Sequence, residues 1–161
     1  KKNIVKQNCM KLECPELQEG KLPAEAGYMN ENRNPALEII DVPEEAESLA
    51  LIFEDPDAVE AAGKIWLHWL TWNIDPETEK IEENASPGVE GETDFPEPGY
   101  NGPNPPDGAH TLRFKLYALD RELELEEESG RENFEEAING HVLDDAELEA
   151  HWEHEHQTRD K

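Results

Sequence analysis

The segment "IWLHWLTWNI", residues 65–74, contains the strongest strand signal in this chain. Aromatic and branched side chains dominate it, which is typical of a strand in a buried sheet. Strict alternation predicts that His68 shares a face with Leu70 and Trp72, and that Trp69 lies on the opposite face. A histidine in such a strand is either a hydrogen-bonded core side chain or a group that meets a ligand.

Other segments repeat this strand character on both sides of it. "SLALIFED" (48–55) is a short apolar run typical of a strand buried on both faces. "TLRFKLYAL" (111–119) alternates, so its even-numbered residues are expected to point inward. "LEII" (37–40) is a weaker strand candidate. Three or four such strands joined by turn-rich segments predict a sheet-based core.

The C-terminal part of the chain has a different pattern. "ENFEEAINGHVL" (132–143) is interpreted as a short helix closed by Gly140. "DDAELEAHWEHEH" (144–156) is interpreted as a second helix, with Leu148 and Trp152 on its buried side. Strands followed by helices predict a mainly β fold, an antiparallel β-sandwich of two sheets with short C-terminal helices.

The length of 161 residues suits one domain. Residues 1–11 contain four lysines and no acidic residue, so we interpret them as a disordered N-terminal extension. Residues 12–161 are then expected to form the single folded domain. Cys9 and Cys14 are expected to be free thiols in a reducing cytoplasm.

The formal net charge is −26, from 14 basic and 40 acidic residues. This charge argues against nucleic acid or an anionic membrane surface as the main partner, since both would repel it. No apolar run is long enough to span a bilayer, so a cytoplasmic protein is expected, not a membrane-embedded one. The acidic excess favours either simple solubility or a salt-rich environment.

Candidate functional residues follow or begin the predicted strands. Asp55 and Asp57 come directly after a buried strand, with Pro56 between them. Such paired acids can bind a cation, act as acid and base, or orient a histidine, but they are also ordinary turn residues. His110 ends the long stretch 76–110, which is rich in proline and glycine and long enough to suggest a functional loop.

If the two acids, His68 and His110 converge at one end of the sandwich, two kinds of site are possible. Imidazoles and backbone N–H groups suit a small oxyanion such as phosphate. Histidines and carboxylates also ligate metals, so a metal-assisted hydrolase using Asp55, Asp57, His68 and His110 is the alternative. No cofactor is predicted.

Five motifs of this chain occur in the order found in phosphatidylethanolamine-binding proteins. They are "SLALIFEDPDA", "WLHWLTWNI", "GYNGPNPPDGAH" followed by "LYALD", "AINGHVL" and "AELEAHW". The chain most resembles the prokaryotic branch described as Raf kinase inhibitor-like proteins.

The resemblance implies a β-sandwich with a small pocket for phosphate, a carboxylate or a phosphorylated head group. It also implies a non-enzymatic binding protein that regulates or inhibits a kinase or a protease. The ligand-binding positions implied by the resemblance are Asp55, Asp57, His68, Tyr100, Gly102, Pro105, Pro106 and His110. Leu112 and Val59 depart from the family pattern, which leaves open a scaffold role with a pocket no longer used.

Overall fold

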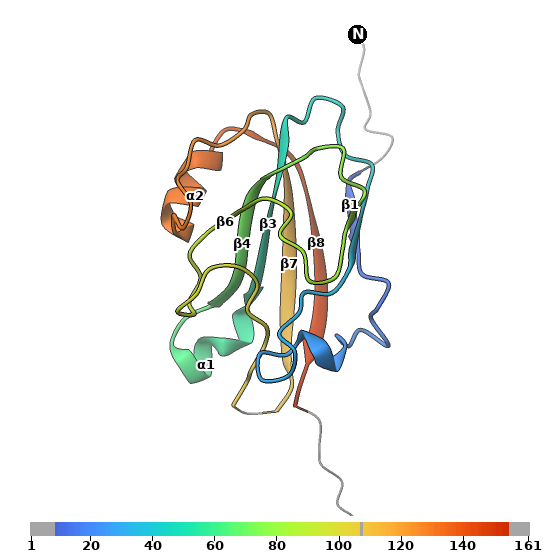
Figure 1. Cartoon of the computed structure of the whole chain (residues 1–161), viewed down its shortest axis with the longest axis vertical. Coiled ribbons are helices and arrows are strands. Elements are labelled where there is room, and N and C mark those ends of the chain that lie inside the picture. Colours follow the sequence, from blue (N-terminus) through green and yellow to red (C-terminus); the bar gives the residue numbers. More distant parts are fainter. Residues whose placement is uncertain (1–8, 107, 155–161) are drawn as a thin grey trace, which may run out of the picture.

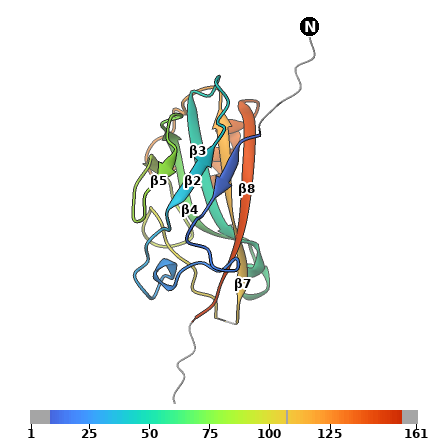
Figure 2. The same ribbon diagram turned by 90° about the vertical axis from the view of Figure 1, so that its right-hand side faces the viewer.

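Two antiparallel sheets form a β-sandwich, as the sequence predicts. The computed structural model describes residues 9–106 and 108–154. The smaller sheet has the strand order β1-β2-β5, and the larger has the order β6-β4-β3-β7-β8. Figure 2 shows β2 and β5 in front of the strands of the larger sheet.

Most strands lie where the sequence predicts them. The strands are β1 (Lys11–Glu13), β2 (Leu37–Ile40), β3 (Ser48–Asp55), β4 (Trp66–Ile74), β5 (Lys80–Ile81), β6 (Val89–Glu90), β7 (His110–Leu119) and β8 (Val142–Trp152). The helices are α1 (Val59–Ala62) and α2 (Arg131–Ile138), with 3-10 turns η1 (Ala24–Ala26) and η2 (Pro56–Ala58).

The larger sheet carries an apolar cluster on each face. The cluster between the sheets includes Phe53, Trp69 and Phe114, and it contains the inward residues of β7 as predicted. The cluster on the other face includes Trp72 and Phe134, the latter from α2. Figure 1 shows α2 beside the larger sheet, near the ends of β3 and β4. Because both faces are covered, β3 is buried along its whole length.

The predicted alternation along β4 is wrong at His68. Phe53 pairs with Trp69 and the next residue, Glu54, pairs with Leu67, so His68 is an extra residue at a β-bulge. His68 therefore lies on the side of Phe53, with ring centroids 5.5 Å apart. Beyond the bulge, Leu70 and Trp72 belong to the cluster on the opposite face. A bulge re-aims a side chain in this way, and here it turns His68 away from the core beneath α2.

The predicted helix over residues 144–156 is also wrong, because Val142–Trp152 forms strand β8. Leu148 and Trp152 are four residues apart, a spacing that places side chains on one side of a helix and of a strand alike. The partner strand decides between them. Glu147 pairs with Lys115 and Glu149 with Arg113 across the β7–β8 ladder. Opposite charges at facing positions stabilise such a pair of strands.

The remaining terminal predictions have mixed outcomes. α2 is confirmed, and Gly140, two residues after its end, has a φ of 84°. Met10 is buried and Lys11 begins β1, so the folded unit includes residues that were assigned to the N-terminal extension. Residues 1–8 of that extension lie outside the described residues. Cys9 and Cys14 are both free thiols, as expected.

Candidate functional site

A cavity of about 250 Å³ lies where β3 ends and where β4 and β7 begin. We call it the His68 cavity. Its lining residues are Asp55, Ala58, Ala62, Trp66, His68, Phe95, Asn104, Pro105, Pro106 and His110. The antiparallel order β4-β3-β7 places these three strand ends side by side. The candidate residues that sequence reasoning derived from separate segments therefore converge, with the exception of Asp57.

Asp55 holds His110 in the cavity wall. Nδ1 of His110 lies 2.6 Å from Oδ2 of Asp55, and both side chains are almost fully buried. Burial raises the pKa of Asp55, and the hydrogen bond from His110 offsets part of that rise. The other carboxylate oxygen, Oδ1, accepts a hydrogen bond from the backbone N–H of Asp57 at 2.9 Å. Asp55 thus orients a histidine, one of the three roles proposed for the acid pair.

Asp57 has a different role, because it does not line the cavity. Pro56 occupies the first position of η2, so the chain turns directly after Asp55. Oδ2 of Asp57 then accepts a hydrogen bond from the backbone N–H of Thr111 at 2.8 Å. This bond ties the turn to the start of β7, next to His110. Asp57 is therefore a positioning residue for the histidine.

His68 is buried within the bulge of β4. Nδ1 of His68 lies 2.7 Å from the backbone oxygen of Asn101. The ring also packs against Phe95, with centroids 5.3 Å apart. Burial lowers the pKa of His68 to about 4, although the Asn101 carbonyl opposes that effect. The side chain is therefore a neutral imidazole near pH 7.

Tyr100 and Gly102 lie behind the cavity wall and do not line it. The hydroxyl of Tyr100 donates to the backbone oxygen of Ala26 at 2.9 Å, and its ring stacks on Phe53. The N–H of Gly102 donates to Oδ1 of Asn32 at 2.7 Å. A Cβ at Gly102 would lie 1.8 Å from the oxygen of Ala26, so only glycine fits this close approach. Both residues fix the loop that carries the two lining prolines.

Sequence reasoning did not identify Phe95, Ala58 or Ala62 as lining residues. Phe95 had a usable signal, because it is the only phenylalanine within the polar stretch 76–110. The two alanines carried no signal. Leu112 is buried in the core between the sheets and Val59 is exposed on α1, so neither departure from the family pattern lines the cavity.

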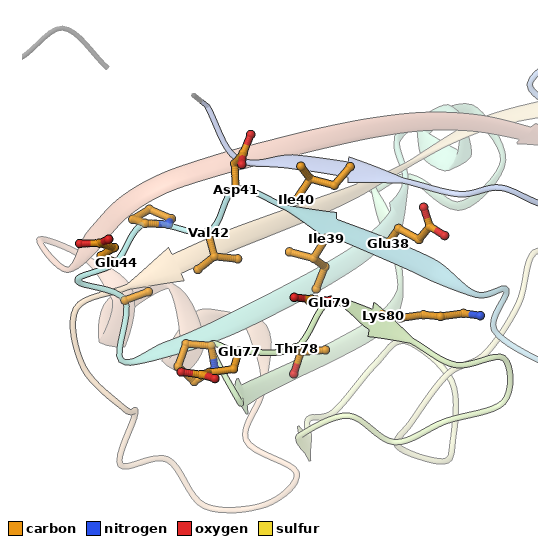
Figure 3. Close-up of a pocket in the computed structure, with 13 residues that line it drawn as sticks. Glu38, Ile39, Ile40, Asp41, Val42, Glu44, Glu77, Thr78, Glu79 and Lys80 are labelled. Carbon is orange, nitrogen blue, oxygen red and sulfur yellow. The ribbon is translucent and has the colours of Figure 1, made fainter. Parts of the chain in front are cut away.

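A second, larger hollow of about 770 Å³ lies at the opposite end of β3 and β4 (Figure 3). We call it the acidic groove. Residues from β2 and the turn that follows it form one side, and the segment leading into β5 forms the other. Its charged residues are Glu38, Asp41, Glu44, Glu77, Glu79 and Lys80. Most of these carboxylates are exposed, and their excess charge makes the groove unsuitable for an anion.

The geometry bears on two further expectations. Within residues 9–106 and 108–154, no group of three or more His, Cys, Asp or Glu side chains could hold a metal ion. In particular, Asp57 points to Thr111 and not to the histidines. No helix in the described part of the chain is long and apolar enough to cross a membrane.

The fold and the site together define a small β-sandwich protein with a histidine-lined cavity at one end. Comparison with known proteins gives the family. Residues 15–153 match the profile described as phosphatidylethanolamine-binding protein, and the chain belongs to that family.

Relatives occur in archaea and bacteria. An archaeal protein named UPF0098 protein, from Methanothermobacter thermautotrophicus, is 43% identical over 136 residues, 80% of this chain and 88% of that one. The crystal structure of CT736 from Chlamydia trachomatis has a TM-score of 0.85 and 36% identity, covering 91% of this chain and 99% of that one. YbcL of Escherichia coli, at 24% identity and a TM-score of 0.80, shares the fold; 89% of this chain and 98% of that chain are covered.

Proposed function

We propose that this protein acts by binding a small phosphorylated or carboxylated ligand in the His68 cavity. The observation that carries the proposal is the convergence of His68 and His110 on one cavity of about 250 Å³. That volume suits a small oxyanion or a head group. Trp66 and Phe95 provide an apolar wall, and Pro105 and Pro106 a rigid one, which is the usual composition of a small-molecule site.

The position of each histidine also supports the proposal. In each ring Nδ1 is held by a protein acceptor, the Asn101 carbonyl for His68 and the Asp55 carboxylate for His110. The rings are therefore held in fixed orientations before a ligand arrives, which lowers the cost of binding. The prediction that the site would use both histidines thus has a geometric basis, whereas Tyr100, Gly102 and Asp57 support the wall indirectly.

The test is an NMR titration of the full chain with phosphate or phosphoethanolamine. We expect the ring signals of His68 and His110 to shift in a saturable way at millimolar ligand. His68→Ala should abolish the response, while Glu79→Gln in the acidic groove should leave it intact. Spectra that stay unchanged for the parent protein at millimolar concentrations of both ligands would contradict the proposal.

The overall charge of −26 sets a further condition on this binding. Its field opposes an anionic ligand at low ionic strength, and salt screens that field. Affinity should therefore rise from low to moderate salt, before competing anions reduce it. Regulation of a kinase or a protease by this protein rests on the family resemblance alone, and inhibition assays with purified enzymes would test it.

A further inference from the structure

The hydrogen bond of His68 determines which ring nitrogen carries the hydrogen. A backbone carbonyl oxygen can only accept, so Nδ1 of His68 donates to Asn101 across the 2.7 Å contact. In the neutral ring Nε2 then has a lone pair and is an acceptor. Among residues 9–106 and 108–154 the only hydrogen bond of the ring is the one from Nδ1, although the backbone of Gly102 also lies close to the ring, and the residue is 2% exposed. The free nitrogen of this cavity residue is therefore an acceptor that needs a donor.

The charges around His68 do not supply a fixed cation for an anionic ligand. No lysine or arginine is among the described residues that line the cavity. Among the described residues, the ionisable groups near His68 are Asp55 on β3, His110 on β7 and Asp94 on the loop beyond β6. Both oxygens of Asp55 already accept hydrogen bonds. Burial also keeps the pKa of His68 near 4, so the ring is reluctant to become a cation.

A fully ionised oxyanion would place an oxygen lone pair against the lone pair of Nε2. Neither group has a hydrogen to share, and a buried acceptor without a donor is costly. A ligand that keeps one acidic hydrogen avoids this cost, because its O–H can donate to Nε2. Phosphate monoesters retain such a hydrogen below a second pKa of about 6, whereas sulfate and phosphodiesters do not have one near neutral pH.

Building on the proposed function, we infer that the His68 cavity selects oxyanions that retain one acidic hydrogen, with that O–H donating to Nε2 of His68. The ligand class is thus a phosphate monoester as its monoanion, or inorganic phosphate, which retains at least one hydrogen near neutral pH. If the hydrogen moves onto His68 after binding, the number of protons bound in the complex is the same. For a phosphate monoester the complex therefore contains one more proton than the sum of the neutral ring and the fully ionised ligand.

The experiment is calorimetry of the full chain with methyl phosphate, dimethyl phosphate and sulfate. At pH 6 we expect methyl phosphate to bind about tenfold or more tightly than either of the other two. Dimethyl phosphate has the charge of the methyl phosphate monoanion, and sulfate has a similar size to inorganic phosphate. The feature that both lack is the acidic hydrogen.

The pH dependence of binding shows whether the titrating group belongs to the ligand or to the protein. Between pH 7 and pH 8 the dissociation constant of methyl phosphate should rise about tenfold, because its monoanion becomes tenfold scarcer. Sulfate, which keeps its ionisation state, should bind with nearly constant affinity over that range. An equal loss of affinity for sulfate would assign the titration to a protein group and overturn the inference.

His68→Asn tests the nitrogen itself. The asparagine amide can still donate toward the Asn101 carbonyl, but nothing replaces Nε2. The preference for methyl phosphate over sulfate should fall to about twofold or less, while His154→Asn, an exposed histidine outside the cavity, should keep the full preference. If the first variant does not fold, the comparison of ligands with the unmodified chain still decides the question.

The two proposals fail in different ways. If none of the three ligands nor inorganic phosphate binds at any pH, the proposed function fails and this inference with it. If methyl phosphate and sulfate bind equally well at pH 6 and pH 8, the cavity binds oxyanions but does not select by the acidic hydrogen. That result overturns the inference alone.

Discussion

The His68 cavity and the acidic groove lie at opposite ends of β3 and β4, and they hold their charged groups in opposite ways. At the cavity end, Asp55 and His68 are almost fully buried and each has a defined hydrogen-bond partner. At the groove end, carboxylates such as Glu44 and Glu79 are exposed to solvent. The larger hollow is thus the less specific one, because water screens its charges.

The same contrast explains why a chain of such high charge can form a defined site. Nearby water and salt weaken the interactions of exposed carboxylates, whereas buried groups keep theirs. Glu54, the residue before Asp55, shows the same behaviour on the other face of β3. Its fully buried carboxylate forms ion pairs with Arg113 and Arg131. Glu54 thus binds Arg131 of α2, while the next residue, Asp55, holds His110 in the wall of the cavity.

Glu54→Gln should have the largest effect on stability. It tests whether a buried ion pair stabilises the fold more than an exposed one. Burial raises the pKa of Glu54, but Arg113 and Arg131 outweigh it, so the net pKa is below its ordinary value. Removing this charge takes a buried partner from both Arg113 and Arg131, and it leaves Arg131 with the exposed Glu135. We expect a loss of about 3 kcal/mol in the free energy of unfolding, measured by urea denaturation.

The matched control is Glu135→Gln, which removes an exposed partner of the same Arg131. That change should cost about 0.5 kcal/mol or less, as exposed helical ion pairs do. Similar losses in the two variants would show that burial does not set the strength of these pairs.

Acid should destabilise the cavity end through His68. Its pKa is about 6.5 in the unfolded chain and about 4 in the folded protein. The unfolded state therefore binds a proton more readily, so stability is complete above pH 6.5 and falls as the pH drops toward 4. The difference amounts to about 3 kcal/mol, since one pKa unit corresponds to about 1.4 kcal/mol.

The measurement is the free energy of unfolding of parent and His68→Asn protein at pH 7 and at pH 4. The parent should lose about 3 kcal/mol more than the variant over this interval. His154→Asn, which removes an exposed ring, should lose as much as the parent. Parallel pH profiles for parent and His68→Asn would mean that His68 binds a proton as readily in the folded state as in the unfolded chain.

The strands of the sandwich could be predicted because a buried strand has a recognisable pattern of apolar residues in its own sequence. The run of eight buried residues in β3 and the alternation of β7 are readable without knowing their partners. β8 could not be predicted in this way. Its acidic residues are explained by Arg113 and Lys115 on the neighbouring strand, and no local pattern contains that information.

The candidate site was predictable to a similar extent. Asp55, His68 and His110 were identified because an acid follows one apolar strand, a histidine interrupts a second and another histidine precedes a third, and all three line one cavity. The face of His68 was predicted incorrectly, because the bulge in β4 depends on pairing with β3. The hydrogen bond from the backbone N–H of Thr111 to Asp57 was not predicted. A carboxylate near a histidine in the sequence suggests contact with a ligand more readily than a hydrogen bond to the backbone.

Gly102→Ala should have a smaller effect that is confined to the cavity end. The added methyl group would lie 1.8 Å from the oxygen of Ala26, so the loop behind Pro105 must move. We expect a loss of about 2 kcal/mol in stability and a clear loss of phosphate affinity. At Gly130 an added methyl group meets only the flexible end of Glu92. Gly130→Ala should therefore retain phosphate affinity, and loss of binding in both variants would count against a local cause.

The smallest effect is expected at the groove end, from the double variant Glu44→Gln and Glu79→Gln. Both side chains are exposed, so the free energy of unfolding should change by about 0.5 kcal/mol or less. The groove and the cavity lie at opposite ends of β3, a strand of eight residues, so their separation exceeds the Debye length of about 8 Å at physiological salt. Phosphate affinity, measured by calorimetry at that salt concentration, should change by less than about twofold. A change as large as that of His68→Asn would mean that the groove charges act on the cavity across the sandwich, and the two ends could no longer be treated as independent.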